Sequence, residues 1–165
     1  ANQKVQEKMS GVTGFTDLMV AQGKVPTSKT ITYHLMSPSL SEMEKLQLND
    51  GDEVLRMERI RYGDDIPICF EVATVPAALV NGLSKSEVTE SLSRALEDKE
   101  HLVIVKAQQT VSAMSAAERI AEYLDIKRGE AILRLRQVSY LQDGRPFEYV
   151  RTQYVGERFE FYLEK

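Results

Sequence analysis

Short strand-like stretches separated by turn residues run along most of the chain, and short helical stretches lie between them. The pattern predicts strands near residues 30–36, 54–62, 102–111 and 159–162, with further strands following Pro67 and Pro146. It predicts helices near 16–22, 76–80 and 91–98 and after two serines. Six or so strands and four or five short helices indicate an α+β domain with a mostly antiparallel sheet.

Helix starts are marked by capping residues. Thr16 is a candidate N-cap, with Asp17 in the first turn and Gly23 as a stop. Two further segments have the capping-box spacing in which serine is followed three residues later by glutamate. These segments are Ser39-Leu-Ser-Glu42 and Ser115-Ala-Ala-Glu118. Each is expected to open a short helix.

One segment of the sequence is echoed later in the chain. A shift of 78 positions superposes Gly51 on Gly129, Leu55 on Leu133, Arg56 on Arg134 and Tyr62 on Tyr140. Each copy follows a predicted helix and runs into a polar turn, a proline and a second strand. We interpret this as one helix-plus-hairpin unit used twice.

Composition narrows the possible functions. The chain has 165 residues, enough for one domain, and its net charge of −4 argues against binding nucleic acid by itself. No apolar run is long enough to span a membrane. A single cysteine, Cys69, suits a reducing, cytoplasmic location, and His34 and His101 do not have zinc-ligand spacing. No motif for a cofactor is present.

The first hairpin concentrates charge on one face. Because side chains alternate along a strand, Arg59 and Arg61 follow Leu55 and Met57 on the same side. With a turn at 63–65, Glu71 is predicted to lie opposite Met57 on that face. Guanidinium groups suit bidentate capture of phosphate or carboxylate. The alternative is that Arg59 and Glu71 only form a salt bridge at the sheet edge.

The second hairpin has a similar mixed face. Glu148, Val150, Thr152 and Tyr154 share one side of their strand. Polar residues within a core pattern on both hairpins favour a wet pocket enclosed by the sheet. Glu148 and Tyr154 either face this cavity or sit at its rim without a role.

Two hydroxyl side chains lie at predicted helix starts, where backbone N–H groups favour anions. These are Thr16 and Ser91. Plain helix capping is the alternative for each.

Several motifs together resemble the effector-binding domain of HutC-type GntR transcriptional regulators, also called the UTRA domain. They are Gly14-Phe15-Thr16-Asp17-Leu18-Met19, the arginine strand at 56–61, Ile66-Pro67 followed by Glu71, Ser91-Leu92 and the closing stretch at 145–159. The resemblance covers about residues 14–161. It implies a chorismate-lyase-like α+β fold with no enzymatic role and no cofactor.

The resemblance also implies specific contacts with a small phosphorylated metabolite, such as a sugar or amino sugar phosphate. The positions expected to hold the phosphate are Phe15, Thr16, Arg59, Arg61 and Ser91, and those expected to contact the sugar are Glu71, Glu148 and Tyr154.

The same resemblance implies how the chain is organised and which partners it has. Residues 1–12 are expected to be a linker remnant and 13–165 the UTRA domain, which forms a homodimer. The N-terminal winged helix-turn-helix that contacts operator DNA in this family is not found in this sequence. In the family, effector binding changes operator affinity, most often that of a repressor.

Two other functions remain open at this point. One is a chorismate-lyase-like enzyme, in which the arginines hold a dicarboxylate. The other is a dimerisation module that binds no ligand, in which Arg59 and Glu71 only pair.

Overall fold

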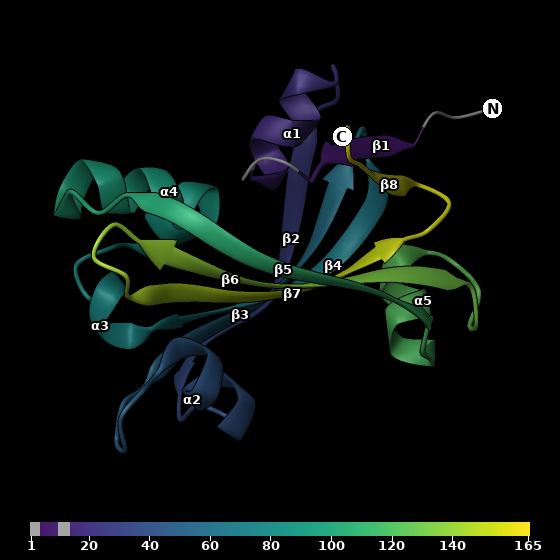
Figure 1. The fold of residues 1–165 in the computed structure, drawn as a ribbon. Helices are drawn as coiled ribbons and strands as arrows, with labels where there is room; N and C mark the ends of the chain where they lie inside the picture. Colours follow the sequence, from purple (N-terminus) through teal and green to yellow (C-terminus); the bar gives the residue numbers. More distant parts are fainter. Residues whose placement is uncertain (1–3, 10–13) are drawn as a thin grey trace.

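The computed structural model describes residues 4–9 and 14–165 and shows a six-stranded antiparallel sheet (Figure 1). Its strands are β2 (Pro26–Met36), β3 (Val54–Gly63), β4 (Ile66–Pro76), β5 (Ile104–Ser115), β6 (Ala131–Leu141) and β7 (Pro146–Val155). They lie in the order β2-β3-β4-β7-β6-β5, so the two hairpins meet along β4 and β7. The expectation of an antiparallel α+β fold with about six strands is confirmed.

Two short strands form a separate parallel pair. They are β1 (Val5–Lys8) and β8 (Phe159–Tyr162). The expected linker at 1–12 is therefore wrong for residues 5–8, where Val5 is buried. Residues 1–3 and 10–13 lie outside the described residues. The pattern of the sequence did not predict β1 because its partner strand lies more than 150 positions away.

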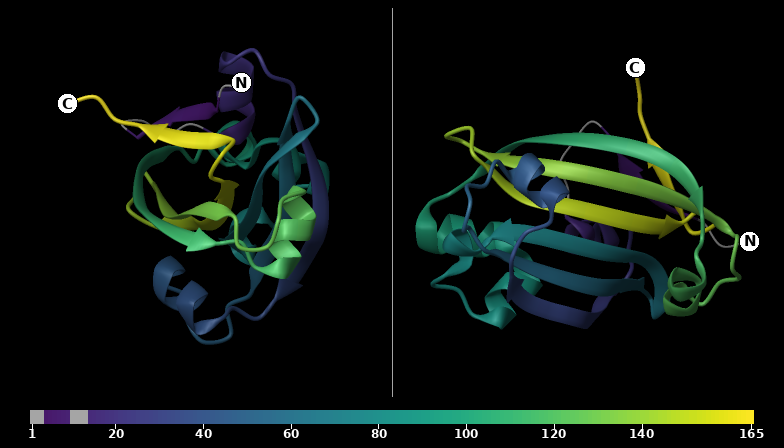
Figure 2. Two further views of the ribbon diagram at one scale, coloured as in Figure 1. Left: turned by 90° about the vertical axis from the view of Figure 1, so that its right-hand side faces the viewer. Right: turned by 90° about the horizontal axis from the view of Figure 1, so that it is seen from below.

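In the described part of the chain, five helices pack against the two faces of the main sheet. They are α1 (Phe15–Ala21), α2 (Leu40–Leu46), α3 (Ala77–Val80), α4 (Lys85–Glu100) and α5 (Glu118–Leu124). Helices α1 and α4 lie on one side together with β1 and β8, and α2 and α5 lie on the other (Figure 1). The sheet is strongly curved, and β1 and β8 cross its concave side (Figure 2).

The predicted repeat is confirmed, and each unit includes one strand more than expected. The first unit runs β2-α2-β3-β4 and the second β5-α5-β6-β7. Gly51 and Gly129 have φ angles of 87° and 90° at equivalent turns, a conformation that favours glycine. Gln47 and Asp125, also 78 positions apart, end their helices in the left-handed conformation.

Of the three N-cap residues predicted from the sequence, the structure confirms one. Ser39 and Glu42 form the expected capping box at α2. Ser115 does not cap α5, because it ends β5 and pairs with Ala131 there; Ala117 takes the N-cap position without a side-chain bond. Thr16 is not an N-cap either. Gly14 precedes α1, and Thr16 is the second residue of that helix.

The register of the first hairpin differs from the prediction by two residues. Asp64 and Asp65, with φ angles of 50° and 64°, form a two-residue loop, and a bulge follows between Arg61 and Tyr62. Arg59 therefore lies opposite Glu71, where the prediction placed Cys69. From Cys69 onward, a shift of two keeps each side chain on its predicted face, so the charged face survives the error.

Apolar side chains cover both faces of the sheet. On the α4 side, Leu55, Met57 and Ala73 pack against Val88 and Leu92. On the other side, residues of α5 pack against the hairpins, in a cluster of Ile60, Phe70, Ala116, Ile120, Ala121, Leu124, Ile132 and Val155. On the α4 side, polar residues replace apolar ones between β3 and β7. The site described below lies there.

Glu42 joins α2 to the sheet through a buried carboxylate. It is fully buried and accepts hydrogen bonds from Arg56 Nε at 2.9 Å, Arg151 Nη2 at 3.2 Å and the Thr74 hydroxyl. Burial by itself would raise the pKa of Glu42, but the hydrogen bonds from Arg56, from the Ser39 amide and from Thr74 lower it to about 2.

We predict that Glu42→Gln lowers the free energy of unfolding by about 3 kcal/mol at pH 7, because two arginines lose a buried charged partner. The loss should shrink as the pH falls from about 4.5 towards about 2, because the wild-type carboxylate becomes protonated in that window. Urea unfolding measures both effects. Glu44→Gln, an exposed change on the same helix, is the control and should cost little; an equal loss in both variants would contradict the prediction.

Candidate ligand-binding site

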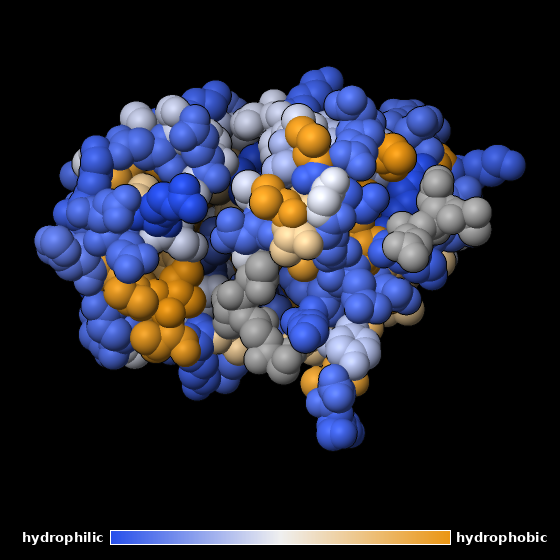
Figure 3. Space-filling view, turned by 90° about the horizontal axis from the view of Figure 1, so that it is seen from above, coloured by the Kyte–Doolittle hydropathy of each residue, from blue (hydrophilic) through white to orange (hydrophobic). Residues whose placement is uncertain are grey.

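A cavity of about 420 Å³ lies between α1, α4 and the concave face of the sheet. Figure 3 shows it as a hollow between the surfaces formed by these two helices. Its volume is in the range of pockets for small molecules, roughly 300–1,000 Å³. The eight residues expected from the sequence all line it: Phe15, Thr16, Arg59, Arg61, Glu71, Ser91, Glu148 and Tyr154.

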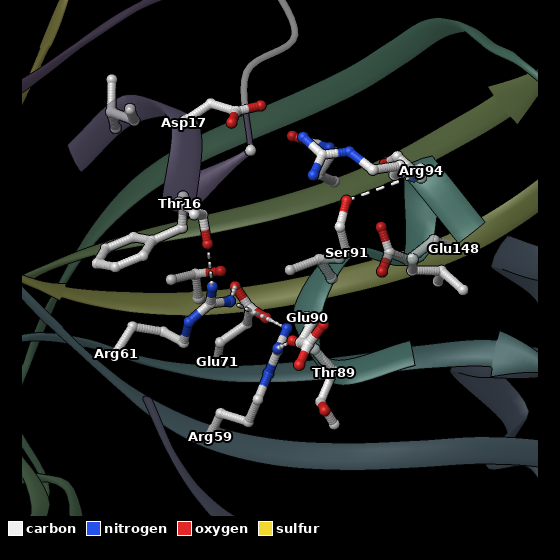
Figure 4. Close-up of a pocket in the computed structure, with 18 of the residues that line it drawn as sticks. Thr16, Asp17, Arg59, Arg61, Glu71, Thr89, Glu90, Ser91, Arg94 and Glu148 are labelled. Carbon is white, nitrogen blue, oxygen red and sulfur yellow. Dashed lines mark hydrogen bonds and ion pairs between the residues drawn. The ribbon is translucent and has the colours of Figure 1, made fainter. Parts of the chain in front are cut away.

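Two arginines and one glutamate form the centre of the cavity wall (Figure 4). Arg59 Nη2 donates to Glu71 Oε1 at 2.6 Å, and Arg61 Nη1 donates to the same oxygen at 3.2 Å. Arg59 Nη1 also donates to the Thr89 carbonyl of α4 at 2.8 Å. The predicted salt bridge thus exists, but it lies in the cavity wall and includes Arg61 as well.

The cluster carries more positive than negative charge. Burial by itself would raise the pKa of Glu71, but the two guanidinium groups lower it below its ordinary value, so the carboxyl is ionised. One carboxylate faces two cations whose side chains are each 8% exposed. The Nε atoms of Arg59 and Arg61 have no hydrogen-bond partner among the described residues. This arrangement favours an anionic ligand.

The first turn of α1 closes the cavity above Arg61. The Arg61 guanidinium lies 4.8 Å from the centre of the Phe15 ring, a cation–π contact. Arg61 Nη2 lies 3.5 Å from the Thr16 hydroxyl, which is the outer limit of a hydrogen bond. Both α1 residues therefore contact an arginine that lines the cavity.

Ser91 lies at a break within α4. Its φ and ψ of −164° and 96° are not helical, and its hydroxyl accepts a hydrogen bond from the Arg94 amide at 3.4 Å. The expected helix start near Ser91 is thus present as the second half of α4, while the first half begins at Lys85 with a capping box. Ser91 caps this second half and lines the cavity at the same time.

Glu148 and Tyr154 lie on β7, the strand that pairs with β4 next to the arginine cluster. Burial raises the pKa of Glu148 to about 7, with a further contribution from the negative charge of Glu71. Burial also raises the pKa of Tyr154 well above its ordinary value, so the phenol is neutral. Glu148 therefore titrates near neutral pH, where it can accept a hydrogen bond from a hydroxyl or an amine.

The residues that sequence analysis set aside lie elsewhere. Cys69 is buried and burial raises the pKa of its thiol, so it is a core residue. His101 ends α4 in the left-handed conformation. In the part of the chain that the structure describes, no group of three or more His, Cys, Asp or Glu side chains is arranged to hold a metal ion.

Sequence reasoning missed several residues of the cavity. Glu7 comes from the unexpected strand β1, and Thr89 and Arg94 come from the turns of α4 on either side of Ser91. Period-two alternation would have placed Glu7 on the same face as Val5, but four residues with a single valine are too weak a signal. The Thr89 contact involves a backbone carbonyl, which no side-chain pattern reveals.

Comparison with known proteins identifies the family. A model of the UTRA domain matches residues 21–160, which is most of the chain. The chain belongs to the UTRA domain family. This domain is the effector-binding domain of HutC-type GntR regulators and not an enzyme, and its chorismate-lyase-like fold agrees with the expectation.

Individual relatives support this assignment. A crystal structure of a GntR-family transcriptional regulator from Enterococcus faecalis V583 is 62% identical, with a TM-score of 0.82; the match covers 84% of this chain and 100% of that one. The HTH-type transcriptional repressor NagR of Bacillus subtilis is 28% identical over 96% of this chain. The mannosyl-D-glycerate transport/metabolism system repressor MngR of Escherichia coli is 24% identical over 98% of it.

This UTRA domain matches only part of those regulators. It spans 65% of the length of NagR and 67% of the length of MngR. Among residues 4–9 and 14–165, no helix combines the length and the apolar character needed to cross a bilayer.

We predict that Glu148→Gln stabilises this UTRA domain more at pH 8 than at pH 5. The folded state raises the pKa of Glu148 from 4.5 to about 7, so stability present at low pH is lost as the pH rises through about 7. The Glu148→Gln variant does not lose this stability. Its gain in unfolding free energy over the wild type should therefore be larger at pH 8 than at pH 5, by up to about 3 kcal/mol. Chemical unfolding at the two pH values measures it.

Thr152→Val in the same cavity wall is the control, because it removes no titrating group. Its effect should be equal at both pH values. A Glu148→Gln effect that is also independent of pH would contradict the raised pKa.

Proposed function

We propose that this UTRA domain binds a small phosphorylated metabolite, such as a sugar phosphate or an amino sugar phosphate. The observation that carries the proposal is the paired guanidinium groups of Arg59 and Arg61, which face one cavity with a single carboxylate between them. A phosphate group offsets the remaining positive charge and offers several acceptor oxygens to the two forks.

The other lining residues suit the two parts of such a ligand. The Thr16 and Ser91 hydroxyls lie on the two helices that close the cavity, where they can donate to phosphate oxygens. Glu148 and Tyr154 on β7 can bind hydroxyl or amino groups of the sugar, and Glu71 on β4 lies between β7 and the arginines of β3.

The names of relatives are consistent with sugar derivatives as effectors. One is described as a repressor of a mannosyl-D-glycerate system, and others as probable repressors of fructoselysine utilisation operons. Each name describes its own protein. For this chain, the class of effector rests on the cavity.

We further propose that the domain acts in the cytoplasm as part of a homodimeric repressor, which contacts operator DNA through a winged helix-turn-helix domain. An effector changes operator affinity only if it binds two states of the regulator differently. Phe15 and Thr16 contact Arg61 from α1, close to the N-terminal end of the described chain. Effector phosphate at Arg61 would fix α1 and thereby change how the two DNA-binding domains are presented.

A module without a ligand is the competing function. In such a dimerisation module, Arg59 and Glu71 would only form a salt bridge with each other. The structure has a cavity of about 420 Å³ beside this pair, and a second arginine, Arg61, lines it. The cavity favours the effector-binding function.

We predict that Arg61→Ala weakens the binding of glucosamine 6-phosphate and glucose 6-phosphate by roughly tenfold to a hundredfold, the value of a charge-assisted hydrogen bond. Isothermal titration calorimetry measures the affinities. Ligand at 100 times its Kd should also stabilise the wild type by about 2.7 kcal/mol in a melting assay, and the variant by less.

Arg61→Lys retains a positive charge and should lose less affinity than Arg61→Ala. Arg128→Ala, at an exposed arginine, is the control and should bind like the wild type. In the regulator that carries this domain, Arg61→Ala should need more ligand to release operator DNA. Release at the wild-type concentration would overturn the proposal.

A further inference from the structure

A glutamate that no sequence motif indicated faces the cavity from β1. Glu7 is only 7% exposed, while Gln6 and Lys8 on either side of it point to solvent. Its carboxyl lines the same cavity as the arginine cluster. Glutamate side chains are seldom buried this deeply unless they are paired.

Glu7 has no such pairing in the part of the chain that the structure describes. Its Oε2 is buried without a hydrogen-bond partner, and Glu7 forms no salt bridge with a described cation. Burial raises the pKa of Glu7 to about 7, with no arginine to lower it. A buried polar group without a partner is energetically unfavourable, so a ligand group that pairs with it would bind favourably.

The neighbours of Glu7 place it at the α1 end of the cavity. Glu7 pairs with Phe161 of β8, whose ring meets the Tyr154 ring edge-on with 5.7 Å between the centres. The adjacent Gln6 amide donates to Gln22 at the end of α1. Tyr154 stacks on Phe159 of β8 with 3.8 Å between the ring centres, and Phe159 pairs with Val5 of β1. The phenol and the carboxyl thus approach the cavity from β7 and β1 respectively.

Glu148 lies at the other end of the same wall. Its backbone is six residues from that of Tyr154 along β7, a Cα separation of about 20 Å at the usual rise of about 3.3 Å per residue, although both side chains line the same cavity. Glu7 and Glu148 are therefore separate acceptors at different ends of the cavity, and Glu148 does not account for the unpartnered Glu7.

An ammonium group would satisfy Glu7 better than a hydroxyl group. It supplies both a hydrogen bond and the opposite charge that a buried carboxylate needs. A lone carboxylate next to a neutral phenol is a suitable acceptor for a primary amine.

We propose that Glu7 is an effector-contacting residue that accepts a charge-assisted hydrogen bond from a primary amino group of the ligand, beside Tyr154. This inference rests on the proposed function and narrows it to phosphorylated metabolites that also carry an amine. It also assigns a role to β1, which pairs with β8 over only four residues. The ligand contacts Glu7 on β1 and Phe15 and Thr16 on α1, and so holds these two segments together around the cavity.

The test compares glucosamine 6-phosphate with glucose 6-phosphate, which differ by the amine alone. Calorimetry should show that the wild type prefers the amine by at least tenfold. Glu7→Gln keeps the shape of the side chain and removes its charge, so the preference should fall at least tenfold. Lys8→Gln, an exposed change on the same strand, is the matched control and should keep the wild-type preference.

A second measurement needs no variant. In amide hydrogen exchange of the wild type, glucosamine 6-phosphate should protect residues 5–8 more than glucose 6-phosphate does at equal saturation. Equal protection by the two ligands, or an unchanged preference in Glu7→Gln, would overturn the role of Glu7.

The outcomes separate this inference from the function on which it rests. If both ligands bind the wild type equally and Arg61→Ala weakens both, the phosphate site stands and the role of Glu7 is overturned. If neither ligand binds the wild type, the proposed sugar phosphate effector fails, and the role of Glu7 fails with it.

Discussion

The buried cluster of Arg59, Glu71 and Arg61 is the interaction on which the site depends. Two cations on the inner face of a sheet are tolerable only because a carboxylate lies between them and a backbone carbonyl of α4 accepts from one of them. That arrangement leaves both Nε atoms without a partner among the described residues and does not balance the charge of the cluster. The cavity is therefore built around a positive charge that an anion from solution can offset.

The two repeated units form the sheet. The charged part of the site comes from residues that differ between the units. The shift of 78 positions relates Arg59 to Gln137 and Arg61 to Ser139, so the second hairpin carries neutral residues where the first carries guanidinium groups. Helices α1 and α4 have no counterparts in the repeat, and they cover this asymmetric face. The guanidinium groups thus lie on β3, and Glu148 and Tyr154 lie on β7 of the second unit, with Glu71 on β4 between them.

The sequence predicted whatever depends on local alternation and turn chemistry. The face shared by Arg59, Arg61 and Glu71 was predicted although the register was wrong by two residues, because alternation has a period of two. Competition between neighbouring elements was not predictable: β5 extends through Ser115 and removes it as a cap. Long-range pairing was also hidden, so β1 and the buried Glu7 were missed.

The most direct test of the account is the ionisation of a bound phosphate, followed by ³¹P NMR of glucosamine 6-phosphate on the domain between pH 5 and 8. A free phosphate monoester has a second pKa of about 6. Two guanidinium groups facing the phosphate should lower the bound pKa by on the order of one unit, and Arg61→Ala should restore most of that difference. A bound resonance that titrates like the free ligand would contradict a phosphate site at Arg59 and Arg61.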